Sequence, residues 1–133
     1  MMTRRYELTA AEWEIIQVVW EHEPCAAPAV QEELVARKKW TYSTVKTLMD
    51  RMVIKDRLTN ERMRNLILYR SAISQQEAQR GELLRTVKRA FGGAFTPMMQ
   101  FMLDSDALSP QEIEKLQSMI QKKRRQGKTH TKE

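Results

Sequence analysis

Within a few residues, the middle of the chain changes from a helical to a strand-like repeat. Residues 42–55 place apolar side chains at the spacing of one helix face, namely Val45, Leu48, Met49 and Met52. Residues 58–62 and 66–69 have the composition of two short strands, and Asn65 between them suits a left-handed turn conformation. The sequence therefore predicts a helix followed at once by a short β-hairpin.

Two more helices are predicted before residue 42. The first begins at a capping box, in which the Thr9 hydroxyl accepts from the backbone N–H of Glu12 and the Glu12 carboxylate accepts from that of Thr9. A second, shorter helix begins near Pro28, a residue favoured in the first helical turn. Three helices followed by a basic hairpin are the outline of a winged helix-turn-helix, whose helix pair is a DNA-binding unit.

The C-terminal part is predicted to form three helices that do not bury a core of their own. The capping residues Ser74 and Ser109 mark two helix starts, and Gly92-Gly93 ends the first of these helices. Because about fifty residues in three helices bury little apolar surface, we expect them to pack against the same helices of a second chain. The predicted dimerisation residues are Phe95, Met98, Phe101, Met102, Ile113, Leu116 and Ile120.

The predicted fold is therefore mostly α, with an N-terminal winged helix-turn-helix, a small β-hairpin wing and a three-helix dimerisation domain. The winged helix DNA-binding domain is expected over residues 1–71 and the helical dimerisation domain over residues 72–124. Residues 125–133 are expected to form a disordered basic tail.

Charge is distributed unevenly along the chain, whose net charge is +6. Residues 6–36 contain seven acids and no Lys or Arg, whereas residues 37–70 contain ten bases and three acids. A basic block in a folded region favours a surface that faces a polyanion, and a solvated charged face is the alternative.

The polar face of the predicted helix over residues 42–55 combines short hydroxyl side chains with long basic ones. The residues expected to face the DNA groove are Ser43, Thr44, Lys46, Thr47 and Arg51. The residues expected to contact the DNA backbone are Lys39, Tyr42, Arg62 and Arg64. For Arg62 and Arg64 a solvated turn is the alternative. Asp50 would repel phosphate, so we expect it to pair with Lys46 one turn away, unless it accepts from a cytosine amine.

Several classes of protein are excluded by what the sequence lacks. It has no Gly-rich nucleotide loop and no hydrolase or metalloprotease motif, so it is not expected to be an enzyme. His22 and Cys25 are too few for a metal site, and no cofactor is expected. No stretch is long and apolar enough to enter a membrane, and a single cysteine fits a reducing cytoplasm.

Five short motifs occur in a fixed order along the chain. They are Leu8-Thr-x-Ala-Glu-Trp-Glu14, Val19-Trp20, Trp40-x-x-x-Thr44-Val-x-Thr47-Leu48-x-x-Arg51-Met, Phe91-Gly-Gly-Ala-Phe95 and Leu108-Ser-x-x-Glu112-Ile-Glu114-x-Leu116. Together they resemble the penicillinase repressor family, the BlaI/MecI/CopY-type regulators of bacteria. The resemblance covers residues 6–123.

This resemblance implies a homodimeric, sequence-specific repressor that binds an inverted-repeat DNA operator and controls a resistance or stress operon, such as one for antibiotic resistance. In the β-lactam branch, a membrane sensor with a metalloprotease leads to cleavage of the repressor, and the matching bond here is Gln100-Phe101. The copper branch binds metal through C-terminal cysteines, which this chain lacks. The alternative function is a winged helix module that binds protein without specific DNA binding, although the basic face disfavours it.

Overall fold

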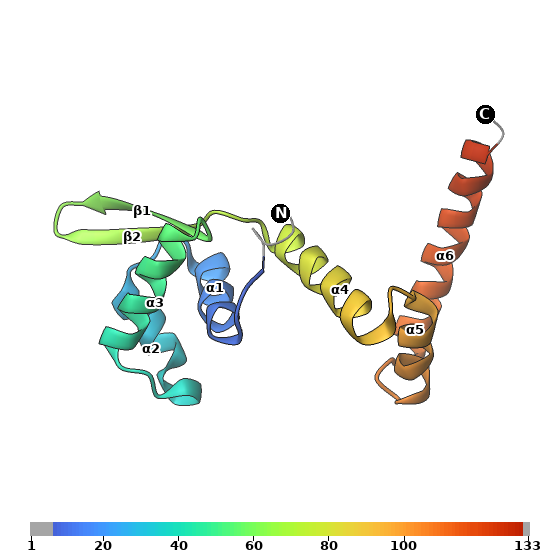
Figure 1. Ribbon diagram of the computed structural model, residues 1–133, viewed down its shortest axis with the longest axis horizontal. Helices are drawn as coiled ribbons and strands as arrows, with labels where there is room; N and C mark the ends of the chain where they lie inside the picture. The colour runs from blue at the N-terminus through green and yellow to red at the C-terminus, as the bar shows by residue number, and fades with distance from the viewer. Residues whose placement is uncertain (1–6, 132–133) are drawn as a thin grey trace. The chain divides into compact units, whose positions relative to one another are not determined.

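The computed structural model describes residues 7–131, with side chains as far as residue 127, and consists mainly of helices (Figure 1). Its elements are α1 (Ala10–His22), α2 (Ala27–Lys38), α3 (Tyr42–Ile54), β1 (Leu58–Met63), β2 (Leu66–Ser71), α4 (Gln75–Phe91), α5 (Phe95–Asp104) and α6 (Pro110–Thr131). The order of three helices, a hairpin and three helices is the predicted one. Among residues 7–131, no helix is long and apolar enough to cross a membrane.

The first three helices and the hairpin share one hydrophobic core. Of the predicted apolar stripe of α3, Val45, Met49 and Met52 are fully buried, and Leu48 is half-buried against the same core. Ile15, Ile16 and Val19 of α1, Val30 and Leu34 of α2, and Leu58 and Tyr69 of the hairpin complete its fully buried centre. One face of α3 is therefore held in the core, and the other is left free.

Local capping sets the starts of α1 and α3. The backbone N–H of Thr9 donates to Glu12 Oε1 over 2.9 Å, and that of Glu12 donates to Thr9 Oγ1 over 3.1 Å, which confirms the capping box. At α3 the Thr41 hydroxyl accepts from the backbone N–H of Thr44 over 3.2 Å. These bonds satisfy N–H groups that have no partner within a helix.

The hairpin is antiparallel, with Leu58 opposite Ser71 and Met63 opposite Leu66. Its two-residue loop is Arg64-Asn65, and the left-handed residue is Arg64 with φ 59°, not Asn65 as the sequence suggested. Positive φ at the first loop residue is required in the two-residue turns whose twist suits a hairpin. The register of the strands thus outweighs the residue preference for Asn.

Two compact units make up the chain, the first ending at Arg85 and the second beginning at Thr86. The sequence predicted a domain boundary after residue 71, where β2 ends. The first unit continues past it because Ile73 and Ala78 are buried in the winged helix core, and Ile73 O accepts from Trp20 Nε1 over 3.1 Å.

The second unit ends in a longer helix than the sequence indicated. Residues 125–131, predicted as a disordered tail, continue α6 to Thr131, and residues 132–133 lie outside the described residues. Arg125, Gln126 and Lys128 favour a helix, but Gly127, Thr129, His130 and Thr131 do not, so residue preference alone does not account for this helical end.

Candidate nucleic-acid interface

The free face of α3 is polar and basic. Tyr42, Ser43, Thr44, Thr47 and Arg51 are all exposed, whereas Lys46 is half-buried. These side chains lie opposite the stripe that fills the core, because positions three and four apart share one face of a helix. The predicted groove residues are thus brought together on one exposed surface.

A tight turn joins α2 to α3. Lys39 adopts the left-handed conformation with φ 55°, and its N–H donates to Val35 O over 3.0 Å. The carbonyl of the next residue, Trp40, accepts from Gln31 Nε2 over 3.1 Å. The turn is therefore fixed at both residues, and the side chain of Lys39, which precedes α3 in the chain, is exposed.

The hairpin carries the remaining predicted contacts. Arg62 faces Ile67 in the register, and Arg64 lies in the loop; both side chains are exposed. Both side chains are therefore open to solvent on the wing.

Lys46 is bound to two groups of its own chain. Its Nζ lies 2.7 Å from Asp50 Oδ2, which confirms the predicted pair, and 5.9 Å from the centre of the Tyr69 ring. The Tyr69 hydroxyl donates to the other oxygen, Asp50 Oδ1, over 2.7 Å. Sequence reasoning missed Tyr69, although a tyrosine in a buried strand signals a hydroxyl that needs a partner.

These contacts shift the charges of the cluster. The hydrogen bond to Asp50, aided by Tyr69, raises the pKa of Lys46 to about 12. Burial alone would raise the pKa of Asp50, but the hydrogen bonds from Lys46 and Tyr69 outweigh it and lower that pKa. Both groups are therefore charged at neutral pH and form an ion pair.

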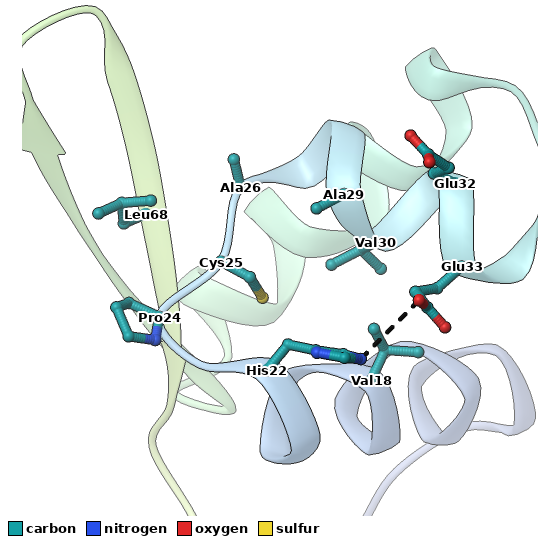
Figure 2. A pocket seen from close by; sticks show the side chains of 10 residues that line it. All are labelled: Val18, His22, Pro24, Cys25, Ala26, Ala29, Val30, Glu32, Glu33 and Leu68. Carbon is teal, nitrogen blue, oxygen red and sulfur yellow. Dashed lines mark ion pairs between the residues drawn. The ribbon is translucent and has the colours of Figure 1, made fainter.

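A pocket of about 440 Å³ lies between α1, α2 and β2 (Figure 2). Its wall is largely apolar, and the only ion pair drawn across it joins His22 Nε2 to Glu33 Oε1 at 3.9 Å. The Cys25 thiol points into the protein there; burial, with the nearby Glu23 charge, raises its pKa. Within the described part of the chain, no three His, Cys, Asp or Glu residues are grouped to hold a metal ion.

The predicted dimerisation residues are exposed to different degrees in a single chain. Phe95, Phe101 and Ile120 are 45%, 67% and 56% exposed, and no residue of α5 is buried. Met98, Met102, Ile113 and Leu116 are half-buried. Gln100, at the predicted cleavage bond, is exposed and donates to Asp104 Oδ1 over 3.1 Å.

Three helices with a short turn before the third, followed by a two-stranded wing, define a winged helix-turn-helix protein. Residues 8–122 match the family model described as Penicillinase repressor. The chain therefore belongs to the penicillinase repressor family, a family of DNA-binding transcriptional repressors and not of enzymes, as the resemblance implied.

Two relatives are similar in sequence to this chain over most of its length. The methicillin resistance regulatory protein MecI of Staphylococcus aureus strain N315 is 24% identical over 123 residues, which are 92% of this chain and all of MecI. The penicillinase repressor of Bacillus licheniformis is 23% identical over 92% of this chain and 95% of its own. The solution structure of the DNA binding domain of the repressor BlaI is 24% identical, with a TM-score of 0.48 over 53% of this chain and 87% of that chain.

Proposed function

We propose that the protein is a homodimeric, sequence-specific transcriptional repressor that binds a double-stranded operator with inverted-repeat symmetry. One observation carries this proposal: α3 buries Val45, Met49 and Met52 and leaves a face of hydroxyl and basic groups open to solvent. A helix held rigidly on one side and polar on the other is suited to lie in the major groove. As a DNA-binding repressor, the protein would work in the cytoplasm.

The proposed contacts follow from the chemistry of each side chain. Lys46 and Arg51 would donate to guanine acceptors, and the methyl group of Thr47 would touch a thymine methyl group. Ser43 and Thr44, at the start of α3, have short hydroxyls that reach bases or phosphates near the helix end. The backbone contacts would come from Lys39, Tyr42, Arg62 and Arg64, which position the protein without reading sequence.

The proposed dimer is built by the second unit. Phe95, Phe101 and Ile120 expose large apolar side chains, which a monomer in water would leave uncovered. Two-fold pairing would place two copies of α3 roughly 34–36 Å apart, or a multiple of this, to match an inverted repeat. Binding of the first half-site would then raise the effective concentration at the second.

Release from DNA is proposed to occur by cutting α5. Both Gln100 and Phe101 are exposed, and no side chain of α5 is buried, so this helix can open locally at small cost. A cut there would detach α6 from the rest of the chain and weaken the dimer. The partner would be a membrane sensor with a metalloprotease, and the controlled operon would serve resistance or stress.

The proposal is tested by titrating the protein into a labelled DNA duplex from its own upstream region. A scrambled duplex of equal length and composition is the control. We expect tighter binding to the upstream duplex by about 10³-fold or more, the range of specific repressors. Equal affinity for the two duplexes would contradict specific repression and favour a winged helix that binds protein instead.

A further inference from the structure

Lys46 is the more restrained of the two basic side chains on the free face of α3. Its ammonium nitrogen lies 2.7 Å from Asp50 Oδ2, and its side chain is 29% exposed. The neighbouring groove candidates Thr47 and Arg51 are exposed. A phosphate or base that binds Lys46 must therefore share its ammonium group with an anion of the same chain.

Asp50 is itself held in place by the wing. Its second oxygen, Oδ1, accepts from the Tyr69 hydroxyl over 2.7 Å. Tyr69 has little freedom, because it is fully buried and its backbone exchanges hydrogen bonds of 2.8 and 3.1 Å with Cys25. The carboxylate is thus anchored from the core side, while its Oδ2 edge binds Lys46.

An anchored carboxylate on a groove-facing helix affects DNA in two ways. It competes with phosphate for the ammonium group of Lys46, and its own charge repels phosphates that come near. Both effects act on any DNA, whatever its sequence. They are offset only where bases supply partners for both charges, such as guanine acceptors for Lys46 and a cytosine amine for Asp50.

We propose that Asp50, anchored by Tyr69, is a specificity-determining residue that weakens binding to unmatched DNA by holding Lys46 in an internal ion pair. This inference rests on the proposed function, because it assigns the role to the same face of α3. The ion pair weakens binding mainly to unmatched DNA, because there Lys46 can bind only phosphate and no base partner compensates Asp50. Asp50 would thereby lower total affinity and raise the ratio between operator and random DNA.

The test compares Asp50→Asn with the unaltered protein, using the full chain. We expect affinity for a random duplex to rise about three- to tenfold in Asp50→Asn, because one ion pair no longer competes in each subunit. The plot of log affinity against log salt should steepen by about 0.9 for each subunit, because Lys46 then neutralises one more phosphate. The ratio of operator to random affinity should fall.

Two further variants separate this role from a change in net charge. Glu32→Gln removes one negative charge from an exposed position of α2 and should leave the ratio and the slope nearly unchanged. Tyr69→Phe keeps the ring but removes the hydroxyl that holds Asp50. It should therefore change the affinity ratio and the salt slope in the same direction as Asp50→Asn. If Asp50→Asn behaves like Glu32→Gln, the proposal is wrong.

A second measurement does not require specific DNA binding. Acylation needs a neutral amine, and the ion pair with Asp50 holds the pKa of Lys46 near 12. Lys46 should therefore react slowly with an acylating reagent, and Asp50→Asn should speed this at least tenfold, with Lys88 as internal reference. Circular dichroism would check that the variants are folded.

The outcomes distinguish the two proposals. If the unaltered protein binds its upstream duplex no better than random DNA, the proposed function fails, and the role of Asp50 is then judged on the salt slope with random DNA and on acylation. If Lys46 is acylated equally fast in the unaltered protein and in Asp50→Asn, the internal pair does not restrain it and the inference is overturned.

Discussion

Lys55, which follows the last turn of α3, places its Nζ 2.6 Å from Oε2 of Glu12 in the first turn of α1. The side chain of Glu12 is only 6% exposed, and its other oxygen caps the helix through the Thr9 N–H. Glu12 therefore caps the start of α1 and also forms an ion pair with Lys55, which is 43 positions away in the sequence. This link ties the end of the proposed DNA-reading helix to the start of α1.

Removal of the Glu12 carboxylate should destabilise the first unit. We expect Glu12→Ala to lower the free energy of unfolding by about 1–3 kcal/mol, because it removes a helix cap and leaves Lys55 without its partner. Glu112→Ala is the matched control, since Glu112 forms the same capping box with Ser109 on an exposed helix. Urea unfolding, followed by circular dichroism, should show the smaller loss for Glu112→Ala.

The contribution of Glu12 should also depend on pH. Burial would raise the pKa of Glu12, but hydrogen bonds from Lys55 and Thr9 lower it below the ordinary 4.5. A lowered folded-state pKa means that the stabilisation is complete above about pH 4.5 and is lost as the pH falls through the folded-state pKa. The stability gap between the unaltered protein and Glu12→Gln should therefore narrow towards about pH 3. A gap that stays constant over this range would contradict the assignment.

DNA binding should weaken steeply with salt. A dimer that uses the basic residues of α3 and the hairpin is expected to make about 6–10 phosphate contacts, so affinity should fall by about 10³–10⁵ between 50 and 200 mM salt. Fluorescence anisotropy titrations at several salt concentrations measure this slope. A flat response would argue against the basic surface as the binding site.

Arg51 should read a base. It is the exposed basic residue one turn beyond Thr47 on the free face of α3, and Arg51→Ala should cost about 1–3 kcal/mol of binding to the operator. Its loss should relax preference at one base pair of each half-site, which a panel of single-base operator variants measures. Arg80→Ala, an exposed change of equal charge in α4, is the control. If Arg51→Ala weakens binding to all DNA sequences equally, Arg51 contacts a phosphate and not a base.

The dimer should depend on the exposed apolar residues of the second unit. Phe101→Asp and Ile120→Asp change side chains that are 67% and 56% exposed in a single chain, so the fold of the monomer should survive. Both variants should become monomeric in analytical ultracentrifugation and bind the operator far more weakly. Val35→Asp, at an apolar residue of α2 that is 44% exposed, should stay dimeric. If the Phe101→Asp variant remains dimeric, the dimer interface lies elsewhere.

The Cys25 thiol should be unreactive in the folded protein. It is 7% exposed, and burial raises its pKa, so little thiolate is present at neutral pH. A thiol-specific reagent should modify it slowly in buffer and rapidly in denaturant. Equally fast modification in both conditions would contradict its place in the core.

Local features of the sequence determined most of the fold. The capping residues Thr9, Glu12 and Ser109 act on groups three residues away, so their effect is visible in a short segment of sequence. The apolar stripe of α3 and the pair of Lys46 with Asp50 follow equally from helical spacing. The five motifs that indicated the family are also short segments of sequence.

Tertiary structure alone decided the contacts between residues distant in sequence. Tyr69 meets Asp50 across 19 positions and Lys55 meets Glu12 across 43, distances at which no helical or strand repeat predicts a pairing. The first unit extends into α4 because Ala78 fills a space left by the winged helix core, which depends on packing and not on residue type. Arg64 takes positive φ because the strands on either side of it fix the loop, and this constraint exists only once they pair.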